Sequence, residues 1–441
     1  MGSFTKNVLI TFFVRILMIV LGLGASIIIA RILEPKGQGI YSLAILLPSL
    51  LVIFTDFGVN FSSIFYIGKK QYSPKEVFGN NIILTLLIST FAILIGLIII
   101  FFFGNELFPG IERRYLILAL TMVPFSLFFS FIVHIFLGLQ KIKKYNLIQF
   151  LQSFFFFVLI GIFLLKLHSG ISFAILAQIF SFILAGLVLF FLIKKETGGI
   201  IFKFSKQYFK DIFVYGFKNY LGTIFSFLHH RIDIFLINIF INPAAVGFYW
   251  IAVKLAETIW HFSQSATTVL FPKVVSEKEQ KQLKEFTPLV CRNVLFITLL
   301  IAFLLFVFGR QIIILFYSEK FLESVQPFQI LLIGAVAMSG LRVLGTDLAG
   351  RGKPMLNTYI TGFSVVLNII LNILMIPRFG ILGAALATAI SYSTAFIIMV
   401  FVYNKVSGNK LKDLFFFKKS DIGFYRSFLL NIRTSRFTRK P

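Results

Sequence analysis

Charged residues and cysteine are scarce in this 441-residue sequence. Only 13% of the residues are Asp, Glu, Lys or Arg, whereas 58% are hydrophobic. Soluble domains carry roughly 25% charged residues, and a water-soluble core cannot hide this much apolar surface, so a soluble enzyme is excluded. The single cysteine, Cys291, cannot form an intramolecular disulfide, and its apolar surroundings predict an inert thiol.

Acidic residues are also few. The sequence has 17 Asp and Glu and 42 Lys and Arg, which gives a net charge of +25. In a soluble protein such an excess would favour nucleic acid as a partner. Here the basic residues follow membrane topology instead. The connections after even-numbered hydrophobic segments hold 17 Lys and Arg, whereas those after odd-numbered segments hold 8. The positive-inside rule therefore predicts cytoplasmic N- and C-termini and no nucleic-acid partner.

Long hydrophobic runs fill the rest of the chain. A spanning helix needs about 20 apolar residues, and the first run continues to about Leu33, which is too long for a signal peptide and is expected to remain as the first span. Short connections containing Pro, Gly and charge separate the runs. Twelve helices are predicted, beginning near residues 8, 39, 79, 114, 145, 170, 212, 244, 287, 326, 355 and 379.

The two halves of the sequence repeat each other. Pro35-x3-Gly39-x-Tyr41-x2-Ala44 recurs as Pro243-x3-Gly247-x-Tyr249-x2-Ala252, and Gly170-Ile171-x2-Ala174 recurs as Gly380-Ile381-x2-Ala384. Six helices per repeat place both halves in the membrane in the same orientation, as in alternating-access transporters with a substrate site between the halves. The predicted organisation is a six-helix lobe at 1–195, a cytoplasmic linker at 196–211, a second lobe at 212–405 and a basic cytoplasmic tail at 406–441.

The tail alternates Phe and Leu with basic residues from Leu411 to Leu430. This pattern predicts an interfacial helix lying on anionic headgroups, with a solvated end as the alternative.

Two segments carry a family resemblance. The first is Arg31-Ile-Leu-Glu-Pro-Lys-Gly-Gln-Gly-Ile-Tyr41-Ser-Leu-Ala44; the second is Gly350-Arg-Gly-Lys353-Pro354, followed by Asn368, Asn372 and Ile376-Pro377-Arg-Phe-Gly380-Ile-Leu-Gly383. They resemble the polysaccharide flippase (Wzx-type, O-antigen) branch of the multidrug/oligosaccharidyl-lipid/polysaccharide (MOP) exporter superfamily. The resemblance implies an all-α integral membrane protein of twelve helices in two pseudo-symmetric lobes, similar to MATE transporters. It also implies export of lipid-linked oligosaccharide units across the cytoplasmic membrane.

Ionisable residues inside the predicted spans are candidates for function, because each costs several kcal/mol unless it faces protein or a water-filled cavity. On the seventh helix, Lys218, His229 and Asp233 share one face, and on the eighth Lys254, Glu257 and His261 do so. The bases are predicted to line a cationic substrate cavity: Arg15, Lys218, Arg231, Lys254, Arg292 and Arg342. The candidates for binding a coupling H⁺ or Na⁺ are Asp56, Asp233, Glu257, Asp347, His229 and His261.

A lipid pyrophosphate is densely anionic, and the planar guanidinium of arginine binds phosphate oxygens bidentately. The excess of bases over acids inside the spans therefore favours this cargo. The alternative for any one residue is an ion pair that merely locks two helices, as Lys254 and Glu257 would form. No catalytic residue, metal site, nucleotide-binding loop or cofactor is predicted.

The leading hypothesis is a multi-pass flippase of the cytoplasmic membrane for polyprenyl-pyrophosphate-linked oligosaccharides. Its partners would be this cargo, membrane lipids and other polysaccharide-assembly proteins. A drug or cation antiporter of the same superfamily is the first alternative, but it would need an acid-dominated or aromatic pocket. A membrane glycosyltransferase or polysaccharide polymerase is the second, although such enzymes need a large outward loop and the longest loops here are predicted to be cytoplasmic.

Overall fold

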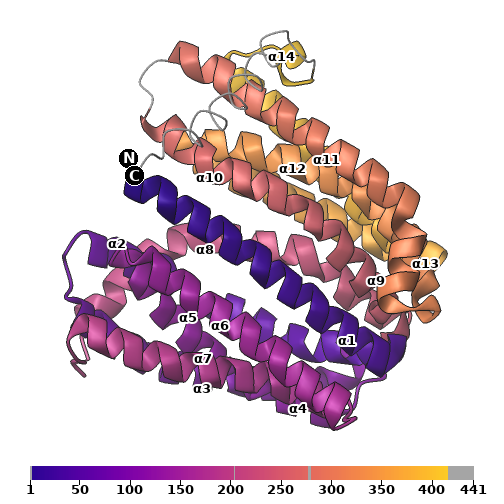
Figure 1. Cartoon of the computed structure of the whole chain (residues 1–441), viewed down its shortest axis with the longest axis horizontal. Coiled ribbons are helices and arrows are strands. Elements are labelled where there is room, and N and C mark those ends of the chain that lie inside the picture. Colours follow the sequence, from indigo (N-terminus) through magenta and orange to yellow (C-terminus); the bar gives the residue numbers. More distant parts are fainter. Residues whose placement is uncertain (1, 203, 277–279, 416–441) are drawn as a thin grey trace, which may run out of the picture. The chain divides into compact units, whose positions relative to one another are not determined.

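The structure is a computed structural model that describes residues 2–202, 204–276 and 280–415. Helices make up nearly all of this range, which contains no strand, so the predicted all-α fold is confirmed (Figure 1). The elements in chain order are α1 (Gly2–Thr55), α2 (Val59–Gly68), α3 (Pro74–Leu107), α4 (Arg113–Leu120), α5 (Met122–Gly138), α6 (Ile142–Ile160), η1 (Gly161–Lys166), α7 (Ile171–Thr197), α8 (Lys206–Phe240), α9 (Pro243–Ala256), η2 (Glu257–Ile259), α10 (Trp260–Ser276), α11 (Gln280–Tyr317), η3 (Glu319–Ser324), α12 (Val325–Gly350), α13 (Pro354–Ser407) and α14 (Leu411–Phe415).

Two of these helices are each divided by one residue with non-helical backbone. Glu34, which precedes Pro35, breaks α1 at φ 59°, and Gly380 breaks α13 at φ 60°. Proline disfavours the helical conformation of the residue before it, and glycine adopts positive φ without steric cost. Both breaks lie where the sequence predicts a connection between two helices.

Nine helices of the described chain are long and apolar enough to cross a membrane. Two of them, α1 and α13, have 54 residues each, or about 80 Å at 1.5 Å per residue, which exceeds the roughly 30 Å hydrocarbon core. The twelve expected starts each fall within a turn or two of the beginning of a helical segment. The number of twelve crossings stays a prediction.

Local sequence explains where several helices begin and end. Ser73 and Glu76 form a capping box at the start of α3, and the Ser205 hydroxyl accepts a hydrogen bond from the Tyr208 N–H at the start of α8. Gly198 ends α7 and Gly408 ends α13, each in the left-handed conformation. These caps satisfy the backbone groups that helix ends leave without partners.

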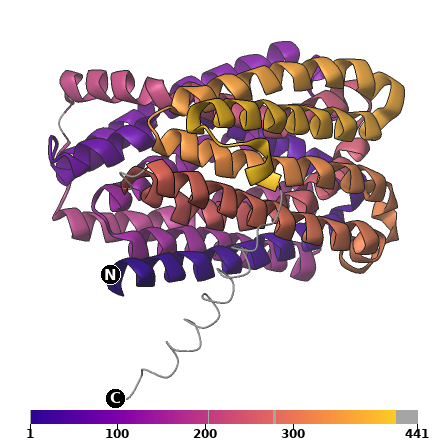
Figure 2. The same ribbon diagram turned by 90° about the horizontal axis from the view of Figure 1, so that it is seen from above.

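The chain forms two compact units. The first comprises residues up to Leu255 together with 308–331 and 365–388; the second comprises 256–307, 332–364 and the described residues from 389 onward. In the first unit, α6 packs on α1 and α7, and α5 packs on α3 and α7. In the second unit, α10, α11 and α12 run side by side in both views (Figures 1 and 2). The predicted lobes at 1–195 and 212–405, with the linker between them, stay a prediction.

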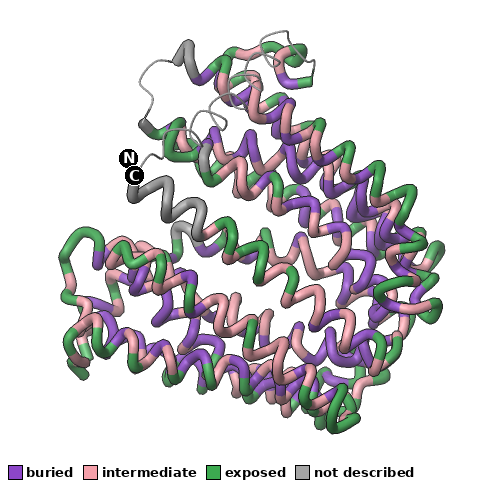
Figure 3. Tube along the Cα trace, in the orientation of Figure 1, coloured by how far each residue is buried: buried purple, intermediate pink, exposed green. Residues whose placement is uncertain are grey.

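Several helices have exposed positions along one face (Figure 3). On α3, Leu87, Phe91, Leu94 and Ile98 follow one another at helical spacing and are each about half exposed or more. A continuous apolar face of this kind is unstable in water and matches a lipid environment. Of the predicted tail, residues 416–441 lie outside the described chain.

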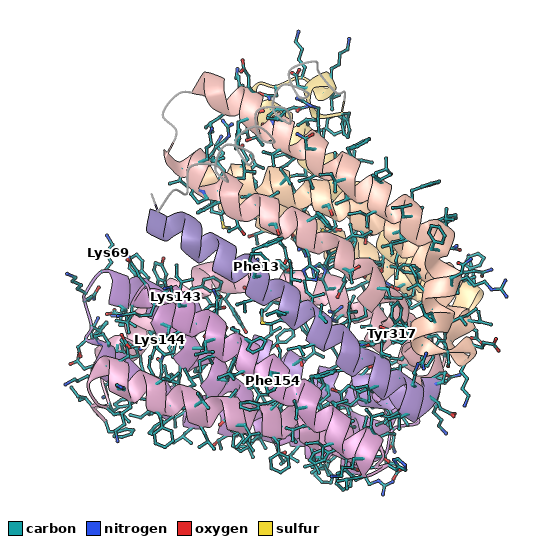
Figure 4. All side chains as sticks on the ribbon, viewed as in Figure 1. Phe13, Lys69, Lys143, Lys144, Phe154 and Tyr317 are labelled. Atoms are coloured by element: carbon teal, nitrogen blue, oxygen red, sulfur yellow. The ribbon has the colours of Figure 1, made fainter. Side chains whose placement is uncertain are left out.

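One end of the first unit is basic. Lys69, after α2, and Lys143 and Lys144, at the start of α6, project from the same end, whereas Tyr317 of α11 lies toward the opposite end (Figure 4). Glu196 of α7 pairs there with Lys141 at 2.9 Å and also with Lys144. Basic connections that the positive-inside rule places on one side of the membrane therefore lie at one end of this unit, and the cytoplasmic orientation of that end stays a prediction.

Candidate functional site

A deeply buried carboxylate of the first unit lies on α8. Asp233 is 2% exposed, and its Oδ2 accepts hydrogen bonds from Tyr249 Oη at 2.6 Å and Thr388 Oγ1 at 3.1 Å. Its Oδ1 accepts the N–H of Ile234 at 2.8 Å. A charge buried this deeply is stable only with such partners, so α8, α9 and α13 are joined at this point.

Two amides on α13 extend this cluster. Asn368 Nδ2 donates to Thr388 Oγ1 at 3.3 Å, and Asn372 Nδ2 donates to Asn368 Oδ1 at 3.0 Å. Both amides are fully buried, and Asn372 Oδ1 has no hydrogen-bond partner in the described chain. The result is a line of oxygen-bearing side chains inside an apolar bundle, which can hold a small hard cation or a proton.

Arg231 lies two residues before Asp233 on α8. Its guanidinium is 5.5 Å from the ring centroid of Trp250 on α9, and its Nη1 donates to His230 O at 2.9 Å. A guanidinium held over an indole face keeps its charge and presents a planar donor edge. Arg231, predicted from the sequence as a substrate-binding cation, therefore lies on the face of Trp250 in the first unit.

Arg342 has a similar environment in the second unit. Its guanidinium is 4.5 Å from the ring centroid of Trp260, and Glu257 and Tyr392 lie close enough to interact with it electrostatically. The protein contains only two tryptophans, and each has one of the predicted arginines on its face. The sequence predicted the arginines but not their aromatic partners.

Two other predicted residues of the second unit make structural contacts. Asp347 is fully buried and pairs with Arg351, while its Oδ1 accepts a hydrogen bond from Thr287 at 2.7 Å. Arg292 is 4% exposed and donates to the backbone carbonyl of Asp413 in α14. Contacts of this kind can lock helices together, the alternative that the sequence left open for each charge, and the predicted site roles of Asp347 and Arg292 stay predictions.

The remaining candidates are placed as follows. Arg15 is exposed on α1, and within the described residues it forms no ion pair. His229 is buried on α8, whereas Lys254 on α9, Glu257 in η2 and His261 on α10 are half-buried. The side chain of Lys218 lies outside the described part of the structure. The predicted pairing of Lys254 with Glu257 and the cationic cavity as a whole stay predictions.

Asp56 lies between α1 and α2, as the segment Thr55-Asp56-Phe57-Gly58 predicts for a helix end. Its Oδ2 accepts a hydrogen bond from Asn60 Nδ2 at 3.1 Å, and the same nitrogen donates to Ser130 Oγ at 2.9 Å. Ser130 lines a cavity of about 410 Å³ in the first unit. The polar side chains of this cavity are Ser49, Ser126, Ser130, His134 and Gln149.

Four residues that surround Asp233 and Asn60 were not predicted as site residues: Tyr249, Thr388, Asn368 and Ser130. Tyr249 belongs to the repeated motif, and Thr388 follows the Gly380-Ile-Leu-Gly383 segment that carries the family resemblance. A signal was present, because Asn368 and Asn372 lie four residues apart in an otherwise apolar run, and buried amides there need partners. Within the described residues there is no group of three or more His, Cys, Asp or Glu that could hold a metal ion.

Sequence comparison shows several relatives. The chain is 25% identical over 383 residues to an uncharacterised membrane protein of Methanocaldococcus jannaschii, covering 81% of this chain and 75% of that protein. It is 27% identical over 210 residues to a probable low-salt glycan biosynthesis flippase, Agl15, of Haloferax volcanii, covering 45% and 44%. It is 24% identical over 395 residues to the capsular polysaccharide biosynthesis protein CapF of Staphylococcus aureus, covering 86% and 94%.

Solved structures with the same fold include two transporters. One is the lipid II flippase MurJ in an inward closed conformation, with a TM-score of 0.76 and 18% identity over 92% of this chain and 89% of that one. Another is an inward-facing multidrug resistance MATE family transporter of the MOP superfamily, with a TM-score of 0.75 and 16% identity over 89% and 94%. At this identity the likeness establishes the fold alone, and it confirms the predicted MATE-like architecture.

Two family matches complete the comparison. Residues 221–374 match the MatE family, and residues 4–277, well over half of the chain, match the family described as polysaccharide biosynthesis protein. The resemblance to polysaccharide flippases of the MOP superfamily is thereby confirmed, and with it a multi-pass membrane protein of transporter type. The chain belongs to the polysaccharide biosynthesis protein family.

Proposed function

We propose that this protein is a flippase that moves polyprenyl-pyrophosphate-linked oligosaccharides across the cytoplasmic membrane by alternating access, with both termini in the cytoplasm. The family match over residues 4–277 is the observation that carries the proposal. Support comes from the relative named as a glycan biosynthesis flippase and from the relative named as a capsular polysaccharide biosynthesis protein.

The cargo determines what the protein must supply. A pyrophosphate in a low-dielectric cavity needs cations that remain charged, and a guanidinium meets this need with paired N–H donors. Arg231 and Arg342 are the leading candidates, because each guanidinium is held over a tryptophan ring. The predicted substrate set also retains Arg15, Lys218, Lys254 and Arg292.

Coupling to an ion gradient is assigned to Asp233. A buried carboxylate that accepts hydrogen bonds from a phenol on α9 and a hydroxyl on α13 changes these interactions when H⁺ or Na⁺ binds, and the change is transmitted to both helices. A drug or cation antiporter is the alternative function, which the MATE-like fold and the MatE family match support.

The deciding experiment is translocation of a fluorescent lipid-pyrophosphate oligosaccharide in proteoliposomes with an imposed H⁺ or Na⁺ gradient. Wild-type protein should flip this lipid, Arg231→Ala should lose at least tenfold in rate, and Arg231→Lys should recover only part of it. Arg113→Ala is the matched control, because Arg113 is an exposed arginine at the start of α4. Asp233→Asn should retain binding of the lipid but lose the response to the gradient.

A different result would reject the flippase. If wild-type protein does not flip the labelled lipid but takes up small organic cations against the ion gradient, the antiporter is the correct function. If Arg231→Ala and Arg342→Ala both flip the lipid at the wild-type rate, the cationic site is wrong even where the cargo is right.

A further inference from the structure

The backbone is broken between α1 and α2 within an apolar stretch of the first unit. Phe57 and Gly58 both have positive φ, 48° and 76°, and α2 begins at Val59. Positive φ is unfavourable for phenylalanine, so packing must impose it. Gly216 of α8 lies against the break, because a Cβ on Gly58 would come 2.4 Å from Gly216 O. In membrane proteins, non-helical backbone of this kind is tolerated only where it is buried in protein or lines a cavity, and in several transporters it forms part of an ion or substrate site.

Two oxygens at this break are buried and have no hydrogen-bond partner in the described structure. They are Asp56 Oδ1 and Asn60 Oδ1. The other carboxylate oxygen of Asp56 accepts a hydrogen bond from Asn60 Nδ2 at 3.1 Å. No Lys, Arg or His of the described chain forms an ion pair with Asp56. An ionised carboxylate without a counter-charge is strongly disfavoured in an apolar bundle.

The groups at the break have the chemistry of a cation site. Carboxylate, amide and hydroxyl oxygens favour hard cations over soft metals. One carboxylate is fully neutralised by a single positive charge, whereas a divalent ion would leave a net charge in a low-dielectric environment. The first turn of α2 directs its N–H groups toward the segment that contains Asp56, which offsets part of the cost of burying a negative charge there.

A cavity adjoins this position through Ser130. Asn60 Nδ2 contacts Ser130 Oγ at 2.9 Å, and Ser130 belongs to the wall of the 410 Å³ cavity. Ser49, His134 and Gln149 also line it, and His134 Nδ1 lies 2.7 Å from Ser130 O. These uncharged polar groups can hydrate a cation without trapping it.

We propose that Asp56 and Asn60, at the break between α1 and α2, bind a monovalent cation of the size of Na⁺ through their side-chain oxygens, with the cavity at Ser130 as its entrance. The site is separate from Asp233. It requires neither the glycan cargo nor flipping, because it is a binding property of the purified full-length chain.

The test is equilibrium binding of radioactive Na⁺ to the purified protein in detergent, with thermal unfolding measured in NaCl and in choline chloride. Asp56→Asn is nearly isosteric and should weaken Na⁺ binding to this site at least tenfold. Asn60→Ala should weaken it in the same direction and guards against a folding defect in the first variant. Asp233→Asn should retain it. Asp211→Asn is the matched control, since that carboxylate already accepts hydrogen bonds from Tyr72 and Gln207.

Any one of three results would overturn the proposal. In the first, Asp56→Asn and Asn60→Ala both bind Na⁺ and are stabilised by Na⁺ as wild type is. In the second, NaCl and choline chloride stabilise wild type equally; in the third, the stability of wild type depends on pH alone, which would make Asp56 a proton site. None of them bears on the flipping assay, so failure of this site is distinguishable from failure of the proposed function.

Discussion

Gly39 of α1 and Gly247 of α9 touch through their backbones. A Cβ on Gly39 would come 1.7 Å from Pro243 O, and a Cβ on Gly247 would come 2.0 Å from Pro35 O. The two glycines hold the same position of the repeated motif, 208 residues apart, and each lies against the proline that begins the other copy. The two copies of the repeated motif therefore pack against each other, and they cross at glycines because neither position has room for a side chain.

Alanine at either glycine should destabilise the protein. The new methyl group would overlap a backbone carbonyl, which cannot move as a side chain can, and such overpacking costs about 1–3 kcal/mol. We expect Gly39→Ala and Gly247→Ala to lower the thermal unfolding temperature in detergent. Gly22→Ala is the control, because nothing lies within 4 Å of a Cβ there and alanine favours the helix. Unchanged unfolding of both variants would mean that this crossing is looser than described.

The two types of ion pair should differ in their contribution to stability. Asp347 and Arg351 are 0% and 11% exposed, whereas Glu34 and Lys320 are 55% and 61% exposed. Asp347→Asn leaves a buried guanidinium without its counter-charge and should cost about 3–5 kcal/mol. Glu34→Gln should cost less than about 1 kcal/mol, because water already screens that pair. Thermal unfolding of the two variants side by side measures the difference, and equal losses would contradict this assignment of burial.

Tryptophan emission should report cargo binding. If Arg231 and Arg342 engage pyrophosphate, each guanidinium shifts relative to its indole ring, and the emission of Trp250 or Trp260 changes. Because there are only two tryptophans, Trp250→Phe and Trp260→Phe assign the signal to one of them. Titration with a polyprenyl pyrophosphate should change emission in wild type, and a neutral polyprenol should not. Equal responses to both lipids would indicate that the chain rather than the headgroup is sensed.

Alkaline pH should weaken one contact between the α2–α3 connection and α8. Burial, together with the hydrogen bond that Tyr72 Oη donates to Asp211 Oδ2 at 2.6 Å, raises the pKa of Tyr72 to about 12. A pKa raised on folding means that this contribution is complete below the unfolded value near 10 and is lost as pH rises from about 10 to 12. Stability in that window should fall more in wild type than in Tyr72→Phe, by thermal unfolding. Parallel curves would show that the Tyr72 hydroxyl is not coupled to folding.

The breaks in the helices were predictable because their causes are local. Glu34 precedes a proline, Gly380 follows Pro377 by three residues, and Asp56 precedes Phe57-Gly58. Each acts through the backbone of one or two residues, so composition and spacing are sufficient to locate it. The membrane environment was predictable for a similar reason, since it follows from the amount of apolar surface regardless of how that surface is arranged.

The candidate site was only partly predictable. Helical periodicity identified Asp233 as a buried charge on α8, but its partners Tyr249 and Thr388 are 16 and 155 residues away. Periodicity specifies which residues share a face of one helix and leaves open which face of another helix meets it. The same holds for the two arginines. Their charge follows from the sequence, whereas their contacts with tryptophan rings depend on the tertiary structure.

The sequence by itself determined the all-α class, the lipid environment, the repeat and the positions where helices break. Only the tertiary structure decided that Asp347 and Arg292 make structural contacts, that Gly39 meets Gly247, and that the oxygens of Asp56 and Asn60 are buried at one break. The physical reason is that class, environment and breaks depend on local backbone preference and total apolar area. Partners and burial depend on which helices pack together, and that choice is made by contacts between residues far apart in the chain.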